Sequence, residues 1–149
     1  MNDKIKQLQA IGAARDVTRH AEVLEALRTE TAEETIQVAA TTLGLLGTPD
    51  GLRVLIGLLA HASANVRLGA VQGLTALGDV RAVSRLAEHL DDEGRARVWW
   101  PSPKAGGYVI GREVALAIDA ITGERLRGDR VRIGAWVARH VTANGEEER

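Results

Sequence analysis

The sequence predicts an all-α protein, an α-solenoid built from about four stacked helical hairpins. Three observations support this: a short glycine-ending pattern recurs along the chain, the segments between its copies have helical spacing, and the apolar residues are mainly Ala, Leu, Val and Ile. The 149 residues include no Phe, one Tyr and one Met, although 45% are hydrophobic. Such a core suits closely packed helices better than a sandwich or barrel, in which aromatic and β-branched residues dominate.

The recurring pattern is an aliphatic residue, two others, a second aliphatic residue and then glycine. It ends at Gly12, Gly47 and Gly78, and a fourth copy has Thr122 before Gly123. Glycine ends a helix readily because it adopts the left-handed conformation without a steric penalty. Each copy is therefore interpreted as the end of one helix and the turn into the next. The spacing between successive glycines of the pattern is longest between Gly78 and Gly123, which indicates an insertion between them.

Residues that favour helix starts follow these turns. Asp79 and Asp129 are each expected to cap the next helix, and Thr48-Pro49-Asp50 predicts a helix that begins at residue 49. Apolar spacing then predicts helices near residues 3–11, 15–28, 32–46, 49–61, 64–77, 80–90, 111–122 and 129–142. These pair into hairpins over residues 1–30, 31–62, 63–92 and 93–142. We expect one domain, 1–142, because lone hairpins with two apolar sides must stack, and a disordered acidic tail at 143–149.

The third hairpin has a distinctive set of residues. It starts with Val66-Arg67, continues in an alanine-containing helix that ends Leu77-Gly78-Asp79, and closes with Leu90-Asp91-Asp92. This pattern resembles the HEAT-like repeats of the phycobilisome-lyase type, and residues 31–62 resemble them less closely. The resemblance implies an α-solenoid of HEAT-like hairpins.

The resemblance also implies a scaffold or adaptor, because most such proteins are of that kind. Similar proteins include some enzymes: bilin lyases, a metal-dependent deoxyhypusine hydroxylase and DNA glycosylases. The hydroxylase uses His-Glu dipeptides as metal ligands, and none of the four histidines here precedes a Glu. Arg67 is expected, by resemblance, to pair with a carboxylate of an adjacent repeat. Ile36 stands at the equivalent position of the previous repeat, so an arginine ladder is not expected.

Composition excludes several classes of site. The chain has no cysteine, so disulfides and thiolate metal sites are excluded. The histidines are scattered over the hairpins, and a metal site needs convergent ligands, so we expect no metal, no cofactor and no catalytic residues. No stretch approaches the ~20 apolar residues of a membrane span. The polar start lacks the apolar run of a signal peptide, so we expect a cytoplasmic protein without a membrane partner.

An aromatic and basic insertion at residues 94–111 interrupts the last repeat. It holds two of the three Trp and the only Tyr, and residues 95–139 carry nine Lys/Arg but only four Asp/Glu. Alternation over residues 95–99 and 108–110 predicts a short β-hairpin around Pro101–Gly107. Trp, Tyr and Arg dominate binding hot spots. The partner-binding candidates are therefore Arg95, Arg97, Trp99, Trp100, Lys104, Tyr108, Arg112 and Arg132.

Three roles for the insertion are open. It could contact a protein partner, fold one Trp back over the exposed end of the solenoid core, or stack Trp and Arg on unpaired bases. Whether Trp99 and Trp100 are buried caps or exposed contacts is also open. The preferred hypothesis is a non-catalytic adaptor or assembly scaffold that holds a protein partner with an acidic surface, using the concave face and the insertion. The alternatives are nucleic-acid binding through the basic C-terminal third and a HEAT-like enzyme such as a lyase or DNA glycosylase. The partner, the pathway and the oligomeric state are not predicted.

Overall fold

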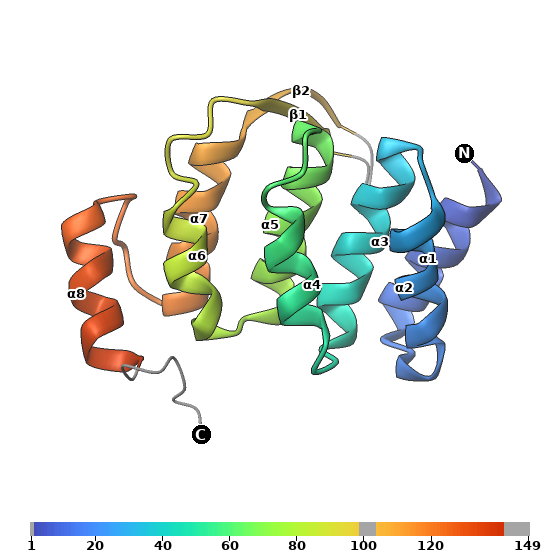
Figure 1. Cartoon of the computed structure of the whole chain (residues 1–149), viewed down its shortest axis with the longest axis horizontal. Helices are drawn as coiled ribbons and strands as arrows, with labels where there is room; N and C mark the ends of the chain where they lie inside the picture. The colour runs from blue at the N-terminus through green and yellow to red at the C-terminus, as the bar shows by residue number, and fades with distance from the viewer. Residues whose placement is uncertain (1, 99–103, 142–149) are drawn as a thin grey trace.

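The structure is a computed structural model that describes residues 2–98 and 104–141. For residues 104–106 it describes the backbone only. The described chain folds into eight α-helices and one two-stranded antiparallel sheet (Figure 1). The elements are α1 (Asp3–Ala14), α2 (His20–Thr29), α3 (Glu33–Leu46), α4 (Gly51–Leu58), α5 (Ala64–Leu77), α6 (Val83–Ala87), β1 (Arg95–Val98), β2 (Lys104–Val109), α7 (Ile110–Thr122) and α8 (Arg130–His140). Short 3₁₀ turns, η1 (Val17–Arg19) and η2 (Val80–Ala82), precede α2 and α6. The predicted all-α stack is confirmed.

The helices stack in two layers, which Figure 1 shows one behind the other. One layer holds α1, α3, α5 and α7, each packed on the next along the row. The other layer holds α2, α4 and α6, and α8 packs beside α6 at its end. Helix α4 makes few contacts with either α2 or α6. The layer of α1, α3, α5 and α7 is therefore the more closely packed of the two. We call the layer of α1, α3, α5 and α7 the inner layer.

Left-handed glycines end three of the four inner helices, as the repeated pattern predicts. Gly47, Gly78 and Gly123 have φ angles of 66°, 69° and 76°. The expectation for Gly12 is wrong: α1 continues to Ala14, and Arg15 takes the left-handed position with φ of 50°. Gly12 is instead a buried residue inside the helix and does not form the turn.

Two of the predicted helix caps form. The Asp79 carboxylate accepts a hydrogen bond from the Arg81 amide at 2.9 Å, and that of Asp129 accepts from the Val131 amide at 2.9 Å. The third prediction is wrong, because α4 begins at Gly51 rather than at residue 49. The Thr48 hydroxyl lies 3.0 Å from Nδ1 of His20 on α2. The Thr48 hydroxyl therefore contacts another hairpin instead of forming the cap of α4 that the local sequence predicts.

Backbone-to-backbone packing joins α3 and α5 at the centre of the inner layer. A Cβ at Gly44 would overlap the carbonyl of Gly73, and a Cβ at Gly69 would lie 2.8 Å from the Gln37 Cα. A Cβ at Gly73 would come within 2.5 Å of the Ala40 carbonyl oxygen. Side chains at these positions would force the helices apart, since real Cβ atoms do not approach so closely. The three glycines thus set the spacing between α3 and α5.

The last pair of helices departs from an antiparallel hairpin. The segment 123–129 runs back alongside α7: the Leu126 amide donates to Asp119, and Gly128 lies against Ala115. Helix α8 therefore starts near the C-terminal end of α6, where the Arg130 guanidinium donates to the Ala87 carbonyl. As Figure 1 shows, α8 runs in the same direction as α7 and closes the end of the stack.

The end of the stack is covered by α8 through its apolar face. Ile133 and Trp136 are buried, with 2% and 3% of their surface exposed. The Trp136 indole stacks on His140 with ring centroids 4.4 Å apart. This third Trp covers the end of the core, a role that the sequence left open for a Trp of the insertion.

No helix of the described chain is both long enough and apolar enough to cross a membrane. The predicted tail, 143–149, lies outside the described residues.

Replacing Gly44 with Ala tests the packing of α3 on α5. The new Cβ would overlap backbone of α5, so the helices must separate and we expect the free energy of unfolding to fall by about 1–3 kcal/mol. Gly57→Ala is the matched control, because Gly57 is exposed in the last turn of α4 and a Cβ there meets nothing within 4 Å. Alanine has the higher helix propensity, so this variant should be stabilised by up to ~1 kcal/mol. Urea unfolding measures both, and equal stability of the two variants would contradict the packing.

Candidate functional site

The insertion forms a β-hairpin that lies over the N-terminal ends of the inner helices (Figure 1). Strand β1 pairs with β2 so that Ala96 faces Tyr108 and Val98 faces Lys104. Ala96 and Val98 are buried, and Arg95 and Arg97 alternate with them on the exposed face. The predicted hairpin is confirmed, although β2 begins at Lys104, within the span expected for the turn.

Two polar side chains fasten the hairpin to α3 and α5. The Gln37 amide nitrogen, on fully buried Gln37, donates to the Arg97 carbonyl at 2.7 Å and to the Asn65 carbonyl at 2.8 Å. The Asn65 side chain accepts from the Arg97 amide at 2.9 Å and donates to Glu33 at 2.7 Å. Buried polar groups require such partners, and this network satisfies groups of α3, α5 and β1 together. The hairpin is therefore part of the folded body and not a loose loop.

A salt bridge holds the base of the hairpin. Arg67 on α5 donates from Nε and Nη2 to the Asp92 carboxylate at 2.7 and 3.1 Å, and both side chains are less than a fifth exposed. Asp92 also accepts from the amide of Gly94, and its carbonyl accepts from that of Gly111. One ion pair thus fixes the segment before β1 and the first turn of α7. The expectation of a partner in an adjacent repeat is wrong, because Asp92 closes the same repeat that Arg67 opens.

These contacts control the ionisation of Asp92. Burial alone would raise the pKa of the carboxyl, but the hydrogen bonds from Arg67 and Gly94 and the charge of Arg67 outweigh it, and the pKa is lowered. A carboxyl with a lowered pKa stabilises the folded state above its ordinary pKa. The base of the hairpin is therefore secured at neutral pH.

The structure brings some of the predicted binding residues together and separates others. Arg95 and Arg97 are neighbours on the outer face of β1, where Arg95 lies over Gly107. Tyr108 lies on the opposite face, half-buried against the core. Lys104 lies in β2 opposite Val98. Trp99 and Trp100 lie outside the described residues.

The last two predicted residues lie on helices rather than on the hairpin. Arg112 is exposed on the first turn of α7, close to the hairpin's base. Arg132 is exposed on α8, at the far end of the stack. Among the candidate residues that the structure describes, Arg132 is therefore the one that lies away from the hairpin.

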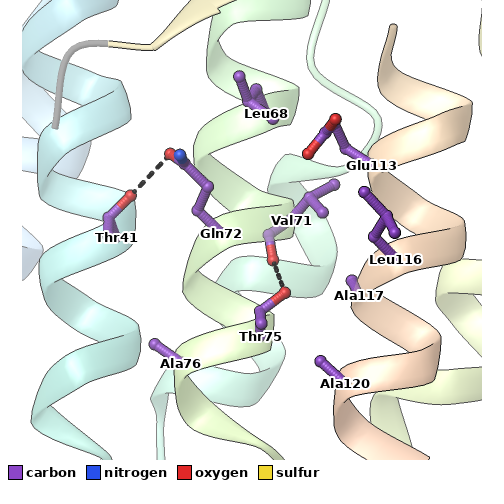
Figure 2. Close-up of a pocket in the computed structure, with 10 residues that line it drawn as sticks. All are labelled: Thr41, Leu68, Val71, Gln72, Thr75, Ala76, Glu113, Leu116, Ala117 and Ala120. Carbon is purple, nitrogen blue, oxygen red and sulfur yellow. Dashed lines mark hydrogen bonds between the residues drawn. The ribbon is translucent and has the colours of Figure 1, made fainter. Parts of the chain in front are cut away.

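An apolar groove of about 450 Å³ opens on the inner layer between α5 and α7, with α3 contributing one residue (Figure 2). No glycine lies where these helices face each other in the groove, in contrast to the α3–α5 contact. The groove is lined by Thr41, Leu68, Val71, Gln72, Thr75, Ala76, Glu113, Leu116, Ala117 and Ala120.

Most polar groups in the groove already have partners. The Thr75 hydroxyl donates to the Val71 carbonyl at 2.8 Å, and the Thr41 hydroxyl donates to Oε1 of Gln72 at 3.2 Å. Both contacts are drawn in Figure 2. The hydroxyls of Thr41 and Thr75 are thus already hydrogen-bonded within the protein.

Glu113 is the exception. Its side chain reaches from α7 toward α5 in Figure 2, and it makes no hydrogen bond or ion pair with any other described residue. Burial raises the pKa of this carboxyl, and the positive charge of the adjacent Arg112 only partly opposes the shift. The groove therefore contains one partly buried acid beside apolar side chains.

Leu116 lies at the edge of this groove with 58% of its surface exposed. Neither Leu116 nor Glu113 was among the residues predicted to bind. A signal was present, because Leu116 lies off the buried face of α7 that contains Val114 and Ile118. A large apolar residue off the buried face of an amphipathic helix indicates a surface left for contact.

A second apolar groove, of about 570 Å³, separates α2 from α4 in the other layer. Leu24, Leu27, Val54 and Leu58 line it, and the paired Glu25 and Arg28 lie at its edge. In the part of the chain that the structure describes, no group of three or more His, Asp or Glu side chains could hold a metal ion.

The family model for HEAT repeats matches residues 20–99, more than half of the chain, from α2 to the end of β1. No curated protein matches the chain.

Replacing Asn65 with Ala tests how the hairpin is fastened. The variant removes the acceptor of the Arg97 amide, so we expect this amide to exchange with solvent faster than in the wild type. Thr75→Ala, on the same helix but remote from the hairpin, should leave the exchange unchanged. Hydrogen exchange followed by NMR measures both variants. Unchanged protection of Arg97 in the Asn65 variant would show that the hairpin is held in another way.

Replacing Asp92 with Asn tests the ion pair at the base. At neutral pH the loss of charge-assisted hydrogen bonds should lower the free energy of unfolding by roughly 2 kcal/mol. The wild type loses this advantage as the pH falls below the ordinary aspartate pKa of 3.8, so the two proteins should converge in acid. Asp91→Asn is the control, since Asp91 is 91% exposed in its pair with Arg130. Urea unfolding at several pH values would refute the assignment if the difference did not depend on pH.

Proposed function

Because the chain belongs to the HEAT-repeat family, whose members are generally protein-interaction scaffolds, we propose that it is a non-catalytic protein-interaction module. It serves as an adaptor or as an assembly or regulatory scaffold. Its main contact surface is the inner layer, at the groove between α5 and α7. The hairpin lies across the N-terminal ends of the inner helices and extends this surface.

The exposure of Leu116 at the groove is the observation that carries the proposal. Exposed apolar side chains are common singly, but one that borders an apolar groove is typical of an interaction site. Apolar contact in a concave surface supplies most of the favourable free energy of association. The lining residues Ala76 on α5 and Ala120 on α7 are exposed and offer such contact on both sides.

The hairpin contributes a basic rim to the same surface. Arg95 and Arg97 project from its outer face, and Arg112 follows at the start of α7. Charges at the rim of an interface influence which partner binds and how fast more than how tightly. A partner with acidic side chains beside its apolar contact therefore fits this end of the protein.

Nucleic-acid binding has less support from the arrangement of the arginines. Exposed arginines of the basic C-terminal third lie on several separate elements: Arg95 and Arg97 on β1, Arg112 on α7, Arg125 and Arg127 between α7 and α8, and Arg132 and Arg139 on α8. Nucleic-acid binders usually gather such residues in one stripe or groove. The groove between α5 and α7 is lined by no basic residue.

Replacing Leu116 with Asp tests the proposed surface. Peptides are first selected from a displayed library of helix-forming sequences with the wild-type protein as bait. We expect the variant to bind the selected peptides at least about tenfold more weakly, because a charge in the groove must be desolvated on binding. Val131→Asp, at an 81% exposed position on α8, introduces the same charge elsewhere and should not change binding. Equal binding by all three proteins would reject the groove as the contact surface.

A further inference from the structure

We propose that the partner segment is an amphipathic α-helix that places a lysine or arginine opposite Glu113 and apolar side chains along the rest of the groove. This inference rests on the proposed function, and it names the chemistry of the partner that the α5–α7 groove accepts.

The dimensions of the groove suit a helix. Along α5 it extends from Leu68 to Ala76, which is about 12 Å at 1.5 Å per helical residue. Apolar side chains at i, i+3 or i+4, and i+7 of a docked helix span a similar length, about 10 Å. Two turns of a partner helix therefore fill the groove between α5 and α7.

Other common modes of peptide recognition do not match the lining residues. Strand addition needs an exposed strand edge, and the walls of the groove are α-helices. Proline-rich segments dock against aromatic side chains, and phosphorylated or acidic motifs dock against arginine clusters. The lining contains neither an aromatic residue nor an arginine. A helix in a groove is the mode that remains.

Glu113 determines the charge of the partner. It is the one charged residue that lines the groove, and it has no partner among the described residues. A docked helix would remove it further from water, and a buried charge without a counter-charge opposes binding strongly. A lysine or arginine on the partner removes this penalty. Glu113 thereby selects basic amphipathic helices over wholly apolar ones.

The occupant is a separate partner rather than a second copy of this chain. In the part of the chain that the structure describes, the exposed large hydrophobic side chains are Val17, Leu116 and Val131, each on a different element. No described helix therefore presents a free apolar ridge at i, i+3 and i+7 that could enter the groove of another copy.

The probe is a displayed library of alanine-based helical peptides, randomised at the i, i+3, i+4 and i+7 positions. Wild-type protein should enrich peptides with one lysine or arginine at a fixed place among apolar residues. Glu113→Gln should weaken the binding of these peptides by about tenfold, which corresponds to one well-desolvated charge contact. Glu124→Gln, an exposed acid beyond the end of α7, is the control for net charge and should bind as the wild type does. Unfolding curves of both variants establish that they are folded.

A charge reversal makes the test independent of that single substitution. Glu113→Lys should lose the selected basic peptides and bind the same peptides with glutamate in place of the lysine. Enriched peptides that need Leu116 but show no basic preference would overturn the inference and leave the proposed function standing. Peptides that bind equally well to Leu116→Asp would overturn the proposed function itself. Concentration-dependent self-association that Leu116→Asp abolishes would identify a second copy as the occupant and overturn the separate partner.

Discussion

The close contact between α3 and α5 is the constraint on which the rest of the structure depends. Gly44, Gly69 and Gly73 let the two backbones touch, so this part of the inner layer is narrow. The neighbouring contact between α5 and α7 has no such glycines and remains open as a groove. The inner layer thus contains one close helix contact and one open groove, and the hairpin lies over the N-terminal ends of the helices that form both.

The same contact explains how the hairpin is held. Because α3 and α5 lie so close, Gln37 on one and Asn65 on the other reach the same backbone segment of β1. The ion pair of Arg67 with Asp92 secures the base of the hairpin from α5. The network joins three segments that are distant in the sequence. A repeat whose inner helices stood further apart would leave this insertion without its polar partners.

The sequence predicted regular features well because they depend on local physics. Helical spacing, the left-handed glycines at 47, 78 and 123, and the caps at Asp79 and Asp129 need only neighbouring residues. The predicted roles of Gly12 and Thr48 were wrong, because α1 continues past Gly12 and the Thr48 hydroxyl contacts His20 of another hairpin. Gln37 and Glu113 are ordinary polar positions in helical patterns, and only the packing of α3, α5 and α7 shows what they face. The sequence identified Arg95 and Arg97 as exposed residues of a hairpin, but it missed the groove, which arises from the spacing of two helices.

The distance between α3 and α5 can be measured directly in solution. A Cβ built on Gly44 would lie 2.6 Å from the Gly73 Cα, so the α-protons of the two glycines must be near neighbours. NMR should therefore show strong nuclear Overhauser effects between the α-protons of Gly44 and Gly73. If spectra that resolve both glycines lack these effects, the close contact is contradicted. The explanations given for the groove and for the attachment of the hairpin to α3 and α5 would then fail as well.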